Sequence, residues 1–169
     1  MKKKVAKILL ILILIIIALI ILKKIKNNKI LNSNALRVSV NNVECNSGDE
    51  IEIKIEILDD SNYVAADFKY EYTEEMEFLD YTKEEVLDKA AMALTNNNNE
   101  SRVVSIGVVQ DPLDPTHFVE KGELITLKFK IKEDITNIVL NPELKCTTLK
   151  ENDGTDISAN IIQSSIKIK

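Results

Sequence analysis

Few residues in this sequence have the types and spacing that catalysis or metal binding requires. The single histidine, His117, lies in the proline-containing segment DPLDPTHF, and one imidazole alone does not form a structural zinc site. With 27 acidic residues, two carboxylates at glycosidase separation would arise by chance. The segment 59–62 lacks the glycine and terminal glutamate of a calcium loop, and no glycine-rich phosphate loop occurs. We therefore predict no enzyme activity, no cofactor and no metal site.

The two cysteines leave two alternatives open. Cys45 and Cys146 lie 101 positions apart, and a disulfide across so long a loop would stabilise the fold by about 4–5 kcal/mol in the entropic model. Nothing in the sequence shows that the two side chains meet. They form either a disulfide or two separate, mostly buried thiols.

Charge divides the chain into two parts. The first 35 residues contain eight lysines and no acidic residue, whereas the remaining 134 residues contain 14 basic and 27 acidic side chains, a net charge of −13. Phosphate binding needs a basic face, so the acidic part argues against nucleic acid as a partner. Its length suits one domain with a hydrophobic core.

The N-terminal part contains a membrane-spanning candidate. Residues 8–22 read ILLILILIIIALIIL, and lysines lie on both sides of this run. We predict an uncleaved transmembrane signal-anchor within residues 1–35, followed by a basic linker. A cleaved signal peptide and a buried core helix are the alternatives, although the small-x-small motif at 33–35 lies far from the apolar run. Four lysines precede the run and four follow it, so charge does not set the orientation.

From residue 36 onward the apolar residues alternate with polar ones. Segments 51–57, 64–72 and 125–131 each place apolar side chains at every second position, which is typical of strands with one buried face. Thr82 and the helical spacing of 83–94 predict a capped helix of about three turns, and the run Asn96–Asn99 predicts a turn. Residues 36–169 are thus predicted to form an all-β domain, an antiparallel, jelly-roll-like β-sandwich of eight or nine strands with one short helix.

The alternation also predicts which aromatic residues are buried. Phe68 and Phe129 fall on the inner faces of their strands, and Tyr70 and Tyr72 share the face of Phe68. Sugar-binding surfaces usually present flat aromatic rings, but this chain has no tryptophan. Asp67 falls on the opposite, outward face of its strand.

Four segments together resemble the cohesin domain, the receptor module that binds dockerins in cellulosome-type assemblies. They are SGDEIEIKIEI (47–57), VAADFKYEY (64–72), KGELITLKFKIK (121–132) and SSIKIK (164–169). The sequence departs from the family where Thr73-Glu74 replaces a common Asp-Pro, and in the length of the segment 83–94. The resemblance implies a non-catalytic module that binds a partner protein.

The resemblance also implies which residues bind that partner. The family's binding face uses outward residues of two neighbouring strands, which correspond here to Ala65, Asp67 and Lys69 on one strand and Ser105, Gly107 and the nearby Gln110 on the other. Among them, Asp67 matches the family's polar contact residue. Any calcium in the complex is expected to belong to the dockerin.

These observations lead to one functional hypothesis and two alternatives. The hypothesis is a single-pass cell-membrane protein whose extracellular cohesin-like domain tethers a dockerin-bearing protein, and through it acts in polysaccharide degradation. The first alternative is a carbohydrate-binding β-sandwich module. The second is a structural or adhesive surface domain.

Overall fold

The computed structural model describes residues 35–60, 63–110, 121–151 and 154–169. Within this part of the chain, no helix is long and apolar enough to cross a membrane. The apolar run 8–22 and His117 lie outside the described residues, so the predicted transmembrane helix stays a prediction.

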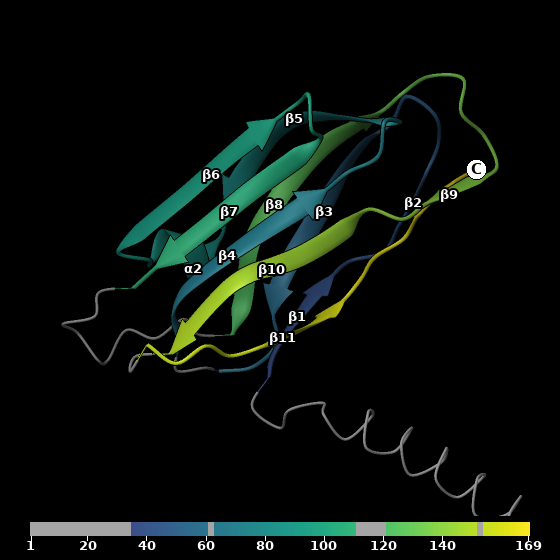
Figure 1. Ribbon diagram of the computed structural model, residues 1–169. Helices are drawn as coiled ribbons and strands as arrows, with labels where there is room; N and C mark the ends of the chain where they lie inside the picture. Colours follow the sequence, from purple (N-terminus) through teal and green to yellow (C-terminus); the bar gives the residue numbers. More distant parts are fainter. Residues whose placement is uncertain (1–34, 61–62, 111–120, 152–153) are drawn as a thin grey trace, which may run out of the picture. The chain divides into compact units, whose positions relative to one another are not determined.

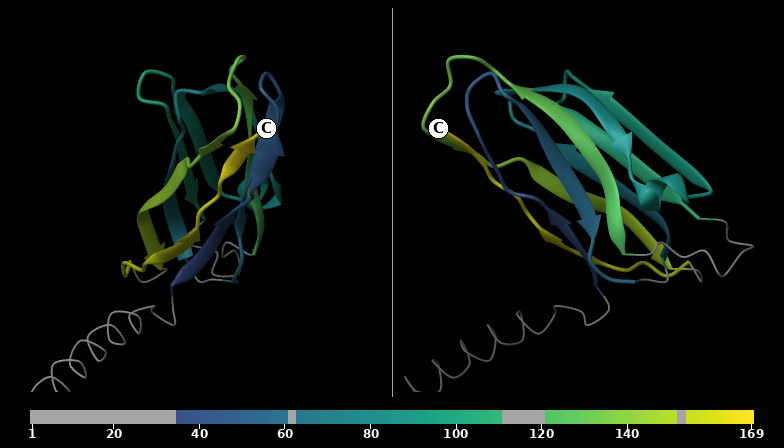
Figure 2. Two further views of the ribbon diagram at one scale, coloured as in Figure 1. Left: turned by 90° about the vertical axis from the view of Figure 1, so that its right-hand side faces the viewer. Right: turned by 180° about the vertical axis from the view of Figure 1, so that it is seen from behind.

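Two β-sheets pack face to face and form a sandwich (Figures 1 and 2). One sheet has the strand order β11-β1-β3-β8-β5, with the bounds Ala159–Ile162, Leu36–Val40, Glu50–Ile57, Gly122–Ile131 and Met76–Lys83. The other has the order β10-β4-β7-β6, with the bounds Glu143–Glu151, Tyr63–Glu71, Val103–Val109 and Met92–Asn98. A small sheet at one end has the order β2-β12-β9, with the bounds Val43–Cys45, Ile166–Ile168 and Ile138–Leu140. The predicted all-β sandwich is confirmed.

Strict alternation explains why the central strands form where they do. In β3 the side chains of Ile53, Ile55 and Ile57 are fully buried, whereas Glu56, between Ile55 and Ile57, is exposed. β3 pairs with β8 in antiparallel fashion, so the inner residues of both strands share one apolar layer. This layer packs against the inner face of the four-stranded sheet.

Aromatic rings fill the centre of the core. The ring of Phe129 lies 5.8 Å from that of Tyr70, 5.1 Å from that of Tyr72 and 5.5 Å from that of Phe78. Phe68 and Phe129 are almost completely inaccessible to solvent, as predicted, and Tyr70 and Tyr72 are buried with them. The rings come from both sheets and therefore join the two layers.

The predicted three-turn helix is wrong in its length. The helix α2 spans only Glu85–Asp88, and its N-cap is Glu84 rather than Thr82. Thr82 belongs to β5, where it pairs with Thr126 of β8. Short helices gain little stability from their own hydrogen bonds, so strand pairing prevails on both sides of α2.

The predicted turn at the asparagine run is also wrong. Residues 92–98 form β6 and pair with β7 along their whole length, so three of the four asparagines belong to a strand. The hydroxyl of Tyr72 donates to the side-chain oxygens of Asn97 and Asn99, each at 3.1 Å. Tertiary contacts thus outweigh the turn preference of asparagine.

The sheets contain two parallel pairs and more strands than predicted. β1 pairs with β11 and β2 pairs with β12 in parallel, whereas the remaining ladders are antiparallel. In each of these two pairs, a C-terminal strand runs beside an N-terminal strand in the same direction. The described residues form twelve strands, since three-residue strands such as β2 and β9 carry no visible alternation.

The two cysteines are separate thiols rather than a disulfide. Cys45 is buried in β2, and Cys146 is half-buried in β10, where its thiol donates to the carbonyl of Thr148 at 3.3 Å. Burial raises the pKa of Cys146 to about 11. Its thiolate is therefore scarce at neutral pH.

The position of Phe129 leads to a prediction about stability. We expect Phe129→Ala to lower the free energy of unfolding by about 3–5 kcal/mol, because it removes a ring that contacts three others. Asp67→Ala, on the exposed side of β4, should cost less than about 1 kcal/mol. Urea unfolding of a 35–169 fragment measures both. Equal losses would mean that the two faces of the sheet are assigned wrongly.

Candidate partner-binding face

The outer surface of the four-stranded sheet brings five of the six predicted binding residues together. β4 and β7 pair in antiparallel fashion, so that Asp67 lies opposite Gly107 and Lys69 lies opposite Ser105. Ala65 follows on the same side of β4. Asp67 and Lys69 are exposed, and the three small residues are half-buried. The predicted juxtaposition of these side chains is confirmed.

Gln110 does not belong to this surface. Its side chain is buried, with 4% exposed, although we expected it at the edge of the face. The outward positions of β7 are odd-numbered, so residue 110 falls on the inward side. Its backbone N–H donates to the carbonyl of Val64 at 2.7 Å and thereby holds the end of β7 against β4.

Asp67 and Gly107 depend on each other for their geometry. A Cβ atom at position 107 would lie 3.1 Å from Oδ1 of Asp67, closer than most such contacts, so glycine lets the carboxylate lie across β7. Within the described residues this carboxylate forms no ion pair. An unpaired carboxylate on a flat surface accepts strong hydrogen bonds from hydroxyl, amide or cationic groups of a partner.

Sequence reasoning missed the apolar part of the face. Met92 is 57% exposed, Leu94 67% and Val109 42%, and the sheet register places Met92 opposite Val109 and Leu94 opposite Gly107. The helical spacing of 83–94 includes Leu94 and so predicts a helix where the strand lies. Met92, Ala93 and Leu94 are all apolar, so this segment has no apolar–polar alternation from which the strand could be predicted.

The other end of the face is charged. Nζ of Lys145 on β10 lies 2.6 Å from a carboxylate oxygen of Glu71 and 3.3 Å from one of Glu143. The hydrogen bond to Glu71 is the main cause that raises the pKa of Lys145. Glu143 is exposed and Lys145 and Glu71 are half-buried at the surface, so these ion pairs contribute more to the charge pattern than to stability.

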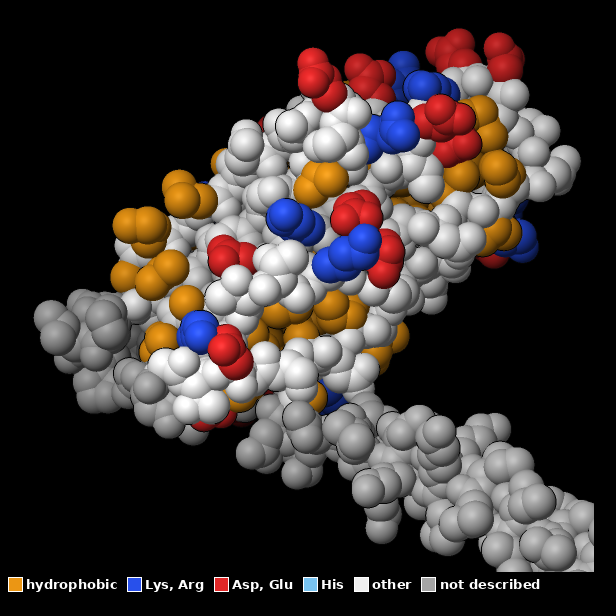
Figure 3. Space-filling model, viewed as in Figure 1, with side chains coloured by type: hydrophobic (Ala, Val, Ile, Leu, Met, Phe, Trp, Pro, Cys, Tyr) orange, Lys and Arg blue, Asp and Glu red, His pale blue; other side chains and the backbone are white. Residues whose placement is uncertain are grey.

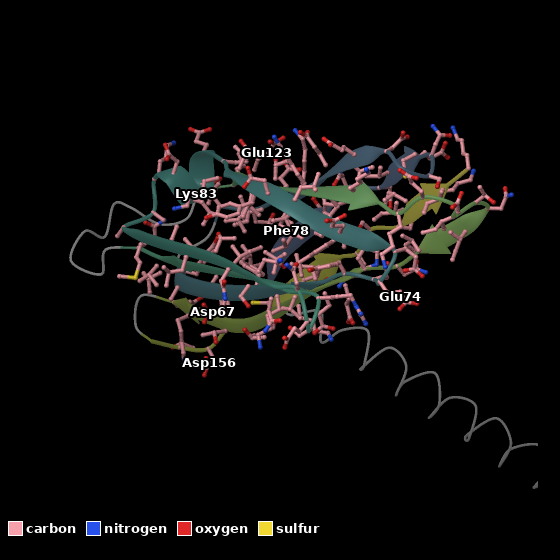
Figure 4. All side chains as sticks on the ribbon, turned by 90° about the horizontal axis from the view of Figure 1, so that it is seen from above. Asp67, Glu74, Phe78, Lys83, Glu123 and Asp156 are labelled. Atoms are coloured by element: carbon pink, nitrogen blue, oxygen red, sulfur yellow. The ribbon has the colours of Figure 1, made fainter. Side chains whose placement is uncertain are left out.

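The face is thus graded from apolar to charged. In Figure 3 hydrophobic side chains gather where β6 begins and β7 ends, and charged side chains occupy the middle of the sheet and β10. Figure 4 shows that Asp67 projects from the side of the sandwich opposite to Glu123. A partner that docks here meets an apolar contact beside a free carboxylate.

Asp59, in the acidic segment considered as a calcium loop, has a structural role. The guanidinium of Arg37 binds Asp59, with Nε 2.8 Å from Oδ2, and this hydrogen bond lowers the pKa of the carboxyl group. Elsewhere in the described ranges, no three histidine, cysteine or acidic side chains converge as metal ligands.

A sequence model of the cohesin domain matches residues 36–168 of the chain. The chain belongs to the cohesin family. Cohesin domains are non-catalytic protein–protein interaction modules, so membership in the family confirms the prediction that the chain is not an enzyme. No curated protein matches the sequence significantly.

Several solved cohesin structures share this fold. The OlpC cohesin of Clostridium thermocellum, solved in a type I complex with a dockerin, has a TM-score of 0.72 at 16% identity and covers 81% of this chain and 95% of that chain. The OlpA cohesin–dockerin complex of that organism gives 0.70 at 14% identity, with 80% and 100% covered. A non-cellulosomal cohesin from the hyperthermophilic archaeon Archaeoglobus fulgidus gives 0.64 at 15% identity, with 80% and 91% covered. At these identities the likeness establishes the fold.

The exposure of Leu94 leads to a prediction that separates strand from helix. We expect Leu94→Thr to change the free energy of unfolding by less than about 1 kcal/mol, because the side chain is exposed on a strand. If Leu94 instead packed inward from a helix, the same substitution would cost about 2–5 kcal/mol. Leu87→Thr is the control, since Leu87 in α2 is 2% exposed and should show the larger loss. Chemical denaturation of the three proteins decides between the two assignments.

Proposed function

We propose that this cohesin domain binds a dockerin-bearing protein through the outer face of the β10-β4-β7-β6 sheet. Membership in the family supports a protein partner, and two of the solved relatives are cohesin–dockerin complexes. The observation that carries the choice of face is the grouping of three exposed apolar side chains, Met92, Leu94 and Val109, beside the free carboxylate of Asp67.

The outer face of the five-stranded sheet is less suited to a partner. There Lys128 lies between Glu52 and Asp80, and Lys130 lies between Glu50 and Glu77. Opposite charges therefore alternate across the strands, as on a solvated surface. A partner would have to strip water from every one of these groups, whereas the other face offers apolar contact.

A helix of the partner fits the graded face. The small residues Ala65, Ser105 and Gly107 let a helix approach closely, and Leu94 beside them supplies area that water leaves on binding. Any calcium in the complex is expected to belong to the dockerin. Any polysaccharide is reached indirectly, through the bound protein.

We further propose that residues 8–22 anchor the protein in the cell membrane, with the domain on the extracellular side and the basic linker between them. The support is fifteen consecutive apolar residues between lysines and the absence of a small-residue cleavage motif directly after them. A domain that captures dockerin-bearing proteins works where those proteins are secreted. The anchor would keep the captured protein at the cell surface.

Binding of sugars or adhesion without a dockerin gains no support from the face. Of the seven aromatic residues described, five are buried and Phe78 and Tyr81 are half-buried. No flat ring among them is free to stack on a sugar. A pull-down of the domain with insoluble glycans, in the absence of other proteins, tests this alternative.

The binding face leads to a prediction about affinity. We expect calcium-dependent binding of the 35–169 fragment to dockerins encoded in the same genome. Asp67→Ala and Leu94→Ala should each weaken it by about 1–3 kcal/mol, through a lost hydrogen bond and a lost apolar contact. Lys128→Ala on the opposite face is the matched control and should bind like the unmodified domain. Calorimetric titration with and without a chelator measures all four proteins.

Two outcomes of this titration contradict different parts of the proposal. Binding to none of the dockerins would contradict dockerin capture as the function. If Lys128→Ala weakens binding while Asp67→Ala and Leu94→Ala leave it unchanged, dockerin capture would still be the function. The binding site would then lie on the other sheet.

The anchor leads to a separate prediction about topology. Protease added to intact cells should remove the domain from the full-length chain, since the domain is proposed to lie outside. Mass spectrometry of the mature protein should find the apolar run 8–22 retained. Protection of the domain until the cells are lysed, or a mature N-terminus near Ala35, would contradict the anchored arrangement.

A further inference from the structure

The middle of β7 presents small residues between two rows of larger side chains. Gly107 and Ser105 point outward from β7, which lies between β4 and β6 (Figure 1). The register places Asp67 of β4 and Leu94 of β6 on the two sides of Gly107, and Lys69 of β4 beside Ser105. β4 and β6 are about 10 Å apart, twice the spacing of neighbouring strands and close to the diameter of a helix. A partner helix along β7 therefore has an apolar flank at β6 and a charged flank at β4.

Lys69 differs from the other outward lysines of β4 and β10 in having no carboxylate partner. Nζ of Lys145 lies 2.6 Å from a carboxylate oxygen of Glu71, and Nζ of Lys150 lies 2.6 Å from one of Asp156. Lys69 is exposed and forms no ion pair within the residues that the structure describes. Its ammonium is therefore free to bind an anionic group of a partner.

The neighbours of Lys69 add to the demand for a negative charge. Lys69 and Lys145 lie directly opposite each other in the β4–β10 ladder, and like charges at such positions repel. The carboxylates of Glu71 and Glu143, at 2.6 and 3.3 Å, offset the charge of Lys145. No described carboxylate does the same for Lys69, so an acidic group of a partner is complementary to this position.

A helix that contacts Asp67 also covers Lys69. Successive outward residues of a strand are about 6.8 Å apart, which is less than two turns of a helix. Covering an ammonium without supplying a carboxylate costs binding free energy, because the charge loses water and gains no partner. Residues four positions apart on a helix are separated by about 6 Å along its axis, which matches the separation of Asp67 and Lys69.

We propose that Lys69 selects dockerins whose contacting helix carries an aspartate or glutamate three or four positions from the residue that binds Asp67. This inference rests on the proposed dockerin-binding function and adds the chemistry of the partner helix. Such a helix has apolar residues toward Met92 and Leu94, a hydroxyl or cationic residue at Asp67 and an acidic residue at Lys69. Dockerins with a neutral or basic residue at the last position bind more weakly.

Charge reversal at position 69 of the detergent-solubilised full-length chain tests this assignment. Each dockerin encoded in the same genome is loaded with calcium and titrated against the unmodified chain, Lys69→Met and Lys69→Glu. For a dockerin that binds, we expect Lys69→Met to weaken binding about threefold and Lys69→Glu about thirtyfold, because two carboxylates then face each other. The difference between the variants should shrink as salt is added, since salt screens exposed charges.

Two controls separate this effect from changes in folding or in overall charge. Lys132→Glu has the same change in net charge, and Lys132 is an exposed lysine just after β8 of the other sheet, with no ion pair in the described chain. This variant should bind like the unmodified chain. Lys69→Glu removes the repulsion of Lys145, so its unfolding temperature should be no lower than that of the unmodified chain.

Compensating substitutions in the dockerin identify the acidic residue. Each aspartate and glutamate on the helices of the dockerin is changed to lysine in turn. One such variant should bind the unmodified chain about tenfold more weakly and bind Lys69→Glu as tightly as the unmodified pair binds. This position should lie three or four residues from the one whose truncation makes binding insensitive to Asp67→Ala.

Four results would overturn the inference, and only the last also concerns the proposed function. Lys69→Met and Lys69→Glu could bind like the unmodified chain, which would mean that Lys69 stays solvated in the complex. Lys132→Glu could weaken binding as much as Lys69→Glu, which would mean that overall charge is responsible. The loss in Lys69→Glu could be restored by none of the lysine substitutions. Binding of none of the dockerins to the unmodified chain would contradict dockerin capture as well.

Discussion

The alternation of β4 between core and surface is the constraint on which the binding face depends. Phe68 and Tyr70 point inward, Asp67 and Lys69 point outward, and β4 is paired on both sides, by β10 and β7. A shift of the register by one residue would bury Asp67 and expose Phe68. Burial of each aromatic side chain is worth about 1.5–3 kcal/mol, so the core fixes which residues the face presents.

The two outer faces of the sandwich differ because their strands have different outward residues. The five-stranded sheet alternates carboxylates and lysines from strand to strand, which suits contact with water. The four-stranded sheet places Met92 and Leu94 on its edge strand, next to small residues and a carboxylate without an ion-pair partner in the described chain. β6 therefore contributes apolar side chains to the proposed dockerin site.

The core and half of the face could be predicted from sequence, because local alternation decides them. Phe68 and Asp67 lie in the segment 66–70, and Phe129 lies in the segment 127–131, where inward and outward residues alternate without a break. β6 could not be predicted, because Val86 and Leu87 do lie in a helix and Leu94 continues their helical spacing. The pairing of β6 with β7 ends that helix. This contact is non-local, so it cannot be predicted from the periodicity of the sequence.

Other differences have the same origin. Gln110 lies next to the outward row in sequence, but β7 ends one residue earlier and the alternation turns its side chain inward. The parallel pairs β1–β11 and β2–β12 join the two ends of the domain, and strand patterns alone contain no information on direction. Short strands were missed because three residues are too few to show a period.

Amide chemical shifts of the isotope-labelled domain, recorded while a calcium-loaded dockerin is added, locate the contact surface at single residues. The account predicts that the largest changes fall on β4, β6 and β7, at Asp67, Leu94 and Gly107, while Glu52 and Lys128 on the other sheet stay unchanged. Changes confined to β3 and β8, with Asp67 and Leu94 unaffected at saturation, would contradict it.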